Sequence, residues 1–174
     1  MKQIIKVKVL TDGCAPQIIG KGEWIDLRAA EDVHIDSPYA STKSKKCGET
    51  TRKVKFTYQY VPLGIAMQLP AGMEALVAPR SSSIKNFNFI QPNSPAVIDN
   101  TYNGDEDEWK GSILCVGEVN IKKGDRICQF RILPSQKATV WQKIKWLLSS
   151  GVEIRIVKSL NNKNRGGLGS TGVN

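Results

Sequence analysis

The chain has 174 residues, of which 40% are apolar and 24% charged, a balance that is typical of a soluble globular domain and argues against wholesale disorder. Its 25 Lys and Arg against 16 Asp and Glu give a net charge of +9, which favours an anionic partner such as nucleic acid, an anionic membrane or a phosphate-rich small molecule. The single histidine, His34, excludes sites that need two imidazoles from one chain, and the four scattered cysteines form no CxxC pair that would indicate a zinc knuckle or a redox dithiol.

The length fits one domain, or one domain with a tail. No segment approaches the roughly 20 apolar residues of a membrane span, and the N-terminal MKQIIKVKVL lacks the continuous apolar core of a signal peptide. We therefore expect a cytoplasmic protein with reduced cysteines and no membrane partner.

Short strands separated by turns dominate the predicted secondary structure. Apolar and polar residues alternate with a period of two over 5–9, 128–132 and 152–156, which is typical of half-buried strands. Turn residues occur at 70–72, 103–104 and 123–125. Many short strands with closely spaced turns predict an all-β sandwich, barrel or jelly roll.

Three segments depart from this pattern. Residues 37–55 carry Lys and Arg repeatedly against one acid, Glu49, and are predicted to be a loop, either a phosphate-attracting arm or a solvated surface. Apolar residues at helical spacing predict a short helix over 141–149 that ends at a Gly151 C-cap and covers a sheet face or fills a subunit contact. The tail, residues 161–174, is rich in Asn and Gly and is expected to fray unless a ligand or partner binds it.

Residue types suited to phosphate binding occur twice. Arg80, Ser81 and Ser82 follow a strand-like segment at 74–78 and offer donors to an anion, although a helix N-cap at Ser81 or Ser82 explains the hydroxyls as well. In the tail, RGGLGSTG (165–172) combines an arginine with glycines and hydroxyls, so its backbone N–H groups can close around phosphate oxygens. It lacks the Gly-Lys-Ser/Thr ending of a Walker A loop.

The segment VIDNTYNG (97–104) predicts a β-hairpin whose tip presents Asp99 and Tyr102 side by side. A turn aspartate usually serves turn geometry, but beside a phosphate site it can orient a water for attack, while the tyrosine packs against a sugar. The acidic run that follows, residues 105–108, is predicted to be a solvated turn, because four consecutive acids cannot all face one metal ion from a strand.

Five segments in order resemble the motifs of the trimeric dUTP pyrophosphatase (dUTPase) family: WIDLRA (24–29), PRSS (79–82), VIDNTYNG (97–104), GDRICQ (124–129) and RGGLGSTG (165–172). The resemblance implies a β-jelly roll that forms a homotrimer, with active sites shared between chains and the tail closing over bound nucleotide. It also implies Mg2+-dependent hydrolysis of dUTP to dUMP and pyrophosphate, which supplies dUMP and keeps uracil out of DNA. Residues 1–160 would then form the β domain, with insertions at about 37–55 and 138–150, and residues 161–174 the closing tail.

The resemblance gives each matching residue a role. Asp99 would orient and activate the water that attacks the α-phosphorus, and Tyr102 would stack under deoxyribose and exclude a 2′-hydroxyl. Asn93 and the backbone around Ile98 would read the uracil edge, and Asp26 would lie near Mg2+, through waters. The residues expected to bind phosphate oxygens are Arg80, Ser81, Ser82, Gln129, Arg165, Ser170 and Thr171.

Four positions depart from the family pattern. Trp24-Ile25 replaces the glycine usually found before Asp26, Ala96 stands where glycine is usual, and the tail motif is shorter than the longest family form. Leu168 occupies the place of the aromatic residue that lies over the uracil. Leucine loses the stacking contribution, on the order of 1 kcal/mol, so we expect weaker substrate retention with intact chemistry.

Other classes of protein remain open at this point. A dCTP deaminase-like relative would need a carboxylate that protonates the cytosine ring. A non-hydrolytic, dUTP-gated regulatory binding protein would engage a protein or DNA through residues 37–55, although a pure binder gains nothing from Asp99. An OB-like nucleic-acid module would use Phe56, Tyr58 and Tyr60 beside lysines, but a half-buried strand explains these aromatics equally well, so a nucleic-acid partner is not expected.

Overall fold

The computed structural model describes residues 1–20, 22–46 and 49–167. In these ranges most of the regular secondary structure is β-strand, as predicted. The strands are β1 (Gln3–Val9), β2 (Ile25–Arg28), β3 (Val33–Ile35), β4 (Tyr39–Lys46), β5 (Glu49–Lys55), β6 (Tyr58–Gln68), β7 (Met73–Pro79), β8 (Phe89–Ile90), β9 (Ala96–Asp99), β10 (Glu108–Cys115), β11 (Val119–Ile121), β12 (Arg126–Pro134) and β13 (Val152–Ile156). The helices are α1 (Ser83–Phe87) and α2 (Val140–Leu147).

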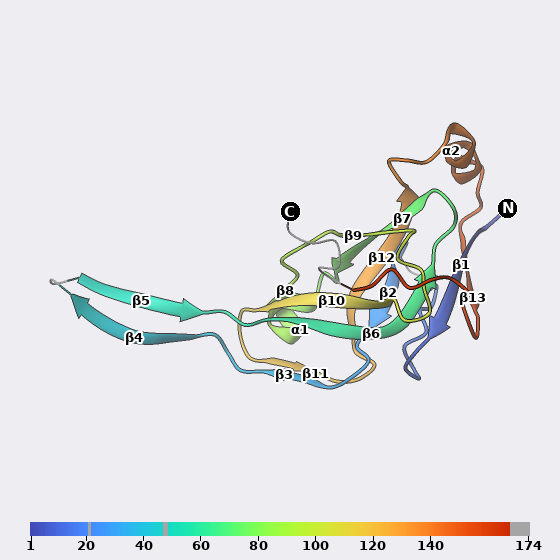
Figure 1. Cartoon of the computed structure of the whole chain (residues 1–174). Helices are drawn as coiled ribbons and strands as arrows, with labels where there is room; N and C mark the ends of the chain where they lie inside the picture. The colour runs from blue at the N-terminus through green and yellow to red at the C-terminus, as the bar shows by residue number, and fades with distance from the viewer. Residues whose placement is uncertain (21, 47–48, 168–174) are drawn as a thin grey trace.

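Two main sheets enclose one core (Figure 1). The first has the strand order β13-β1-β6-β10-β8 and the second β2-β12-β7-β9. Between them the rings of Trp109, from the first sheet, and Phe130, from the second, pack edge to face with centroids 5.4 Å apart. Both side chains are fully buried, so the apolar faces of the two sheets stabilise each other as in a jelly roll.

Alternation along the sequence located several strands correctly. In β1, Ile5 and Val7 are fully buried while the intervening Lys6 is exposed, and β12 repeats the pattern with buried Cys128 and Phe130. β13 follows it less well, because Ile156 is 54% exposed. The described cysteines Cys14, Cys115 and Cys128 are buried and free, as packing residues would be.

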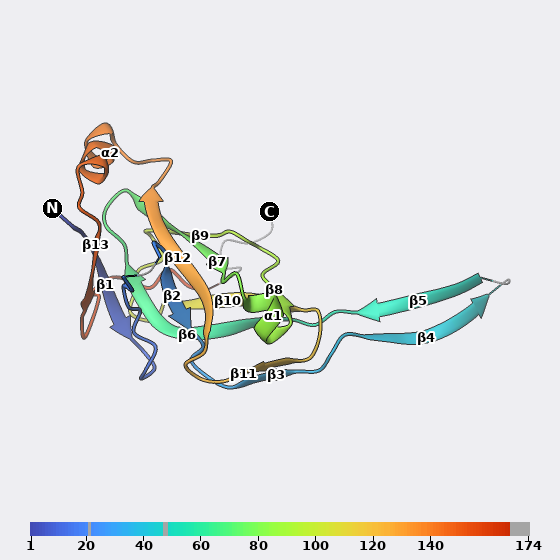
Figure 2. The ribbon, with the colours of Figure 1, turned by 180° about the vertical axis from the view of Figure 1, so that it is seen from behind.

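The prediction of a loop over 37–55 is wrong. β4 and β5 pair antiparallel from Tyr39↔Lys55 to Lys46↔Glu49, and they form a ribbon that projects from the body of the molecule (Figures 1 and 2). The loop prediction rested on the many Lys and Arg residues of this segment. The segment also contains Thr50, Thr51 and Val54, which are β-branched residues that favour an extended backbone.

The predicted helix forms as α2, with shifted ends. Its N-cap Thr139 exchanges hydrogen bonds with Gln142 in a capping box, and its C-cap is Leu148 and not Gly151. Trp146 packs against the core, but Trp141 is 73% exposed. The helix therefore covers its own chain only in part, on the side of Trp146, and the alternative, a subunit contact, stays a prediction. In the described part of the chain, neither helix has the length and apolar character that a membrane crossing requires.

The predicted hairpin over 97–104 is also wrong. β9 pairs with β7 in the second sheet, whereas β10 pairs with β6 and β8 in the first. The intervening loop carries the chain from one sheet to the other, and its acidic residues bind a segment that is distant along the chain. This crossing places Asp99 and Tyr102 at the junction of the two sheets.

Candidate active site

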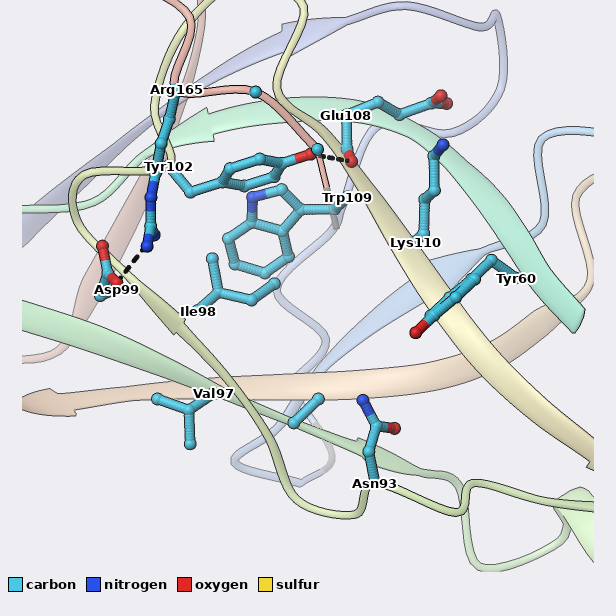
Figure 3. Close-up of a pocket in the computed structure, with 13 residues that line it drawn as sticks. Tyr60, Asn93, Val97, Ile98, Asp99, Tyr102, Glu108, Trp109, Lys110 and Arg165 are labelled. Carbon is cyan, nitrogen blue, oxygen red and sulfur yellow. Dashed lines mark hydrogen bonds and ion pairs between the residues drawn. The ribbon is translucent and has the colours of Figure 1, made fainter. Parts of the chain in front are cut away.

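A pocket of about 640 Å³ lies at this junction (Figure 3). It brings together predicted site residues from β9, from the loops on either side of that strand, and from the tail. Its walls are formed by Tyr60, Asn93, Ala96, Val97, Ile98, Asp99, Tyr102, Glu108, Trp109, Lys110, Arg165, Gly166 and Gly167.

Asp99, the last residue of β9, has both carboxylate oxygens engaged. Oδ1 accepts the backbone N–H of Thr101 at 2.8 Å and the Thr101 hydroxyl, and Oδ2 accepts Nη1 of Arg165 at 2.9 Å. Partial burial tends to raise the pKa of Asp99, but the Thr101 hydrogen bonds and the Arg165 charge outweigh it, so the pKa is lowered from its usual value. Asp99 is therefore an ionised, oriented hydrogen-bond acceptor at neutral pH.

Tyr102 forms the wall next to this carboxylate. Its Oη donates to the backbone carbonyl oxygen of Glu108 at 2.9 Å, and its ring lies beside the fully buried Trp109 (Figure 3). Burial raises the pKa of Tyr102, so the phenol stays protonated. The ring of Tyr102 is thus a fixed apolar surface. Its hydroxyl, which is protonated and bound to the Glu108 carbonyl oxygen, is not suited to act as an acid or a base.

The opposite end of the pocket presents a polar group from the loop before β9. The Ser112 hydroxyl donates to Oδ1 of Asn93, which directs the Asn93 amide nitrogen toward the pocket (Figure 3). Tyr60 flanks this end and packs edge to face on Tyr58, with centroids 5.0 Å apart. An amide donor among apolar walls is suited to a flat ring that carries a carbonyl group.

A second cluster gathers at the junction of β2, β7 and β12. The Asp26 carboxylate accepts Nε of Arg80 at 2.9 Å and Nη1 of Arg126 at 2.9 Å. Gln129 is paired with Asp26 in register and donates to the backbone oxygen of Pro79 at 3.2 Å. Ser82 occupies the N-cap of α1 without a side-chain capping bond, so capping does not account for its hydroxyl.

This cationic cluster is not part of the pocket in one chain. Asp99 pairs with Glu74 near the start of β7, whereas Arg80 follows Pro79 at the end of the same strand. At about 3.3 Å per residue, that strand separates their backbones by roughly 20 Å. The predicted residues therefore form two groups: Asn93, Ile98, Asp99, Tyr102 and Arg165 in the pocket, and Asp26, Arg80, Ser81, Ser82 and Gln129 outside it.

The described residues do not form a protein cage for a metal ion. Among them, no three His, Cys, Asp or Glu side chains gather in a way that could bind one. Both oxygens of Asp26 accept from guanidinium groups, so direct coordination of Mg2+ by Asp26 would compete with two arginines. The donor set fits an Mg2+ ion that is bound mainly by phosphate oxygens and water.

The acidic run forms the predicted turn, which the Asp107 N–H closes onto the Gly104 carbonyl oxygen at 3.2 Å, but it is not fully solvated, because it also binds the start of the tail. Asp107 is 2% exposed and accepts the backbone N–H groups of Arg165 and Gly166, while Asp105 accepts that of Leu160 at 2.7 Å. These contacts bring Arg165 into the pocket. The predicted tail residues Leu168, Ser170 and Thr171 lie outside the described residues.

Four residues that line the pocket were not predicted to belong to this site: Tyr60, Glu108, Trp109 and Lys110. Tyr60 comes close only because β6 pairs with β10, where it lies opposite Ser112. The other three begin β10, which starts at Glu108, the last residue of the acidic run. For Trp109, the short distance along the chain from Tyr102 was a sequence signal that it could lie near the site.

Comparisons with known proteins point to one family. The dUTPase family model matches residues 46–171. The chain is 45% identical over 153 residues to the SPbeta prophage-derived deoxyuridine 5'-triphosphate nucleotidohydrolase YosS of Bacillus subtilis (strain 168), covering 88% of this chain and 86% of that protein. It is 32% identical to the deoxyuridine 5'-triphosphate nucleotidohydrolase of Hydrogenobaculum sp. (strain Y04AAS1), covering 99% of both chains.

Solved structures share the fold at low sequence identity. The dUTPase from Streptococcus mutans superimposes with a TM-score of 0.60 at 19% identity, over 77% of this chain and 98% of that one. The dUTPase of Staphylococcus bacteriophage 80alpha with dUPNHPP gives 0.58 at 17% identity, over 97% and 98%. A mutant dUTPase from phage phi11 of S. aureus, described with a structural Mg(II) ion, gives 0.59 at 16% identity, over 78% and 94%.

Proposed function

We propose that this chain, which belongs to the dUTPase family, hydrolyses dUTP to dUMP and pyrophosphate through attack of water on the α-phosphorus. The observation that carries this proposal is the ionised, oriented carboxylate of Asp99 inside the pocket, next to Tyr102. A carboxylate repels a triphosphate, so its presence is disadvantageous for binding alone and useful for activating water. The reaction supplies dUMP and keeps uracil out of DNA.

In this mechanism Asp99 accepts a proton of the attacking water. Thr101 fixes Oδ1, so the water binds at Oδ2, the oxygen that faces Arg165. When the Arg165 guanidinium turns from Asp99 to a phosphate oxygen, the carboxylate loses a cation and becomes a stronger base. The same movement brings positive charge to the phosphates, where negative charge develops during attack.

Base and sugar selection follow from the fixed walls of the pocket. The Asn93 amide nitrogen, which Ser112 orients, donates to a uracil carbonyl, and the backbone at Ile98 completes the polar contacts. Tyr102 packs against deoxyribose. Because its hydroxyl is bound to the Glu108 carbonyl oxygen, the ring cannot move aside, and it excludes a 2′-hydroxyl. Discrimination of this kind is strong, since a wrong base leaves buried polar groups unpaired.

We further propose that the site is completed by a second chain within a homotrimer. The pocket lacks the cationic cluster of Arg80, Ser81, Ser82 and Gln129, which lies roughly 20 Å away along β7. Next to the pocket, Tyr58, Tyr60 and Ile90 remain 44%, 38% and 40% exposed. An apolar surface of this kind beside an incomplete site is suited to contact with another copy, which then presents its Arg80 cluster to the phosphates.

The substrate is the Mg2+ complex of dUTP in this proposal. The ion stabilises the charge of the triphosphate and of the leaving pyrophosphate. Arg80 and Gln129 bind phosphate oxygens, and Asp26 holds the Arg80 guanidinium in place through its 2.9 Å ion pair. Asp26 would reach the ion through water, as the resemblance to the family implies.

Pyrophosphate release tests the function. Wild type and Asp99→Asn are compared with Mg2+ and dUTP, with dTTP, dCTP and UTP in parallel. We expect hydrolysis of dUTP alone, and its loss in the variant. Tight dUTP binding without turnover would instead indicate a regulatory binder, and ammonia release from dCTP would indicate a deaminase.

A further inference from the structure

The loop between Tyr102 and β10 is fastened to the start of the tail by a buried acid. Asp107 Oδ2 accepts the backbone N–H of Gly104 at 2.8 Å and that of Arg165 at 3.0 Å, and Oδ1 accepts the N–H of Gly166 at 3.2 Å. Asp107 is only 2% exposed, and within the described part of the chain it forms no ion pair. Backbone N–H groups therefore compensate the burial of this carboxylate.

The residues before Asp107 add further hydrogen bonds between the loop and the tail. Asn164 accepts the backbone N–H of Glu106 at 3.0 Å and donates to its side chain at 2.8 Å. Asp105 accepts the Leu160 N–H. Gly104 has no room for a side chain, because a Cβ there would clash with the backbone and the side-chain oxygen of Asn164. Loop and tail thus form one closely packed unit.

Two contacts of Arg165 make this attachment relevant to catalysis. Its backbone N–H binds Asp107, and its guanidinium reaches Asp99 at 2.9 Å. Gly166 and Gly167 follow, and Gly166 adopts a φ of 94°. A Gly-rich segment has many accessible conformations, so without an anchor Arg165 would sample many positions relative to the pocket.

We propose that Asp107 is a positioning residue for dUTP hydrolysis, which fixes the backbone at Arg165 so that the guanidinium stays within reach of both Asp99 and the phosphates. This inference rests on the proposed function. Asp107 itself does not line the pocket, and it acts through Arg165. Because it also binds Gly104, it couples the tail to the loop that carries Tyr102.

Trypsin cleavage after Arg165 measures the attachment without any substrate. The Gly166 N–H belongs to the scissile bond and is bound by Asp107, so cleavage requires release of the tail. Asp107→Asn replaces an acceptor oxygen by an NH2 group that faces N–H donors, and we expect cleavage after Arg165 to accelerate by about tenfold or more. The matched control is Asp32→Asn, a surface acid paired with Lys122, which should leave this rate unchanged.

A double-mutant cycle on kcat/KM separates positioning from general structural support. Asp107→Asn should lower kcat/KM by about tenfold, and should cause no further loss in an Arg165→Ala background. Additive losses would show that Asp107 supports the Tyr102 loop and does not act through Arg165, and unchanged cleavage with unchanged kcat/KM would also overturn the proposal.

A second variant covers the case in which Asp107→Asn does not fold. Glu106→Ala, at an exposed position, removes the side-chain bond to Asn164 and should also accelerate cleavage after Arg165. No acceleration would contradict attachment through this loop. A wild-type protein without dUTP turnover would refute the proposed function and leave the cleavage result intact, so the two failures are distinguishable.

Discussion

The guanidinium of Arg165 donates to the carboxylate of Asp99 across a 2.9 Å ion pair, joining a residue of the tail to the last residue of β9. The two side chains are 39% and 46% exposed, so the pair contributes little to stability. Its importance is electrostatic, because Arg165 helps to lower the pKa of the proposed catalytic group. In the proposed mechanism, phosphate oxygens compete with Asp99 for the same guanidinium.

Arg165→Ala should move the pH dependence of the reaction. Loss of the cation raises the pKa of Asp99 toward its usual value, so the acid limb of the kcat/KM profile shifts to higher pH. We also expect kcat/KM at neutral pH to fall by at least about tenfold, because a charge-assisted contact to the phosphates is lost. Initial rates between pH 4 and 9 measure both effects, and an unshifted acid limb would contradict the role of this pair.

Tyr102→Phe should affect stability more than chemistry. The substitution removes the hydrogen bond to the Glu108 carbonyl oxygen, at a cost of about 1 kcal/mol in the free energy of unfolding, while the ring that we propose packs against the sugar remains. We expect kcat to change by less than about threefold. A loss of kcat as large as that of Asp99→Asn would show that the hydroxyl takes part in the reaction.

Mixed oligomers test whether the pocket and the Arg80 cluster come from different chains. Arg80→Ala and Asp99→Asn are each expected to be inactive, but co-assembled chains should regain activity. With equal amounts and random assembly, about a quarter of the sites combine an intact Asp99 with an intact Arg80 from a neighbour. Inactive mixtures would indicate that both residues serve a site within one chain. Mixing each variant with itself provides the control.

Leu168→Phe should strengthen substrate binding. The resemblance to the family places an aromatic residue over the uracil at this position, and stacking of this kind contributes on the order of 1 kcal/mol, or roughly a fivefold decrease in KM. Since only the contact with the base changes, kcat should stay the same. Steady-state kinetics with dUTP measure KM and kcat, and Leu168→Met is a control of similar volume. An unchanged KM in Leu168→Phe would count against the expectation.

The family and part of the fold were predictable because their signals are short in sequence. Alternation in 5–9 and 128–132 identified β1 and β12, since the two faces of a strand are set by neighbouring residues. The motifs around Arg80 and Asp99 identified the family for the same reason, as each keeps its residues within a few positions. The family match confirms that part of the analysis.

The tertiary structure decided what depends on the path of the chain. The sequence predicted a hairpin at 97–104, but β9 and β10 belong to different sheets, and strand pairing depends on the whole fold. The acidic run gave no sign that it binds the tail, since Asp107 and Arg165 are 58 residues apart. Local patterns fix which residues face a core or carry chemistry, whereas contacts between distant segments form only when sheet packing brings their backbones together.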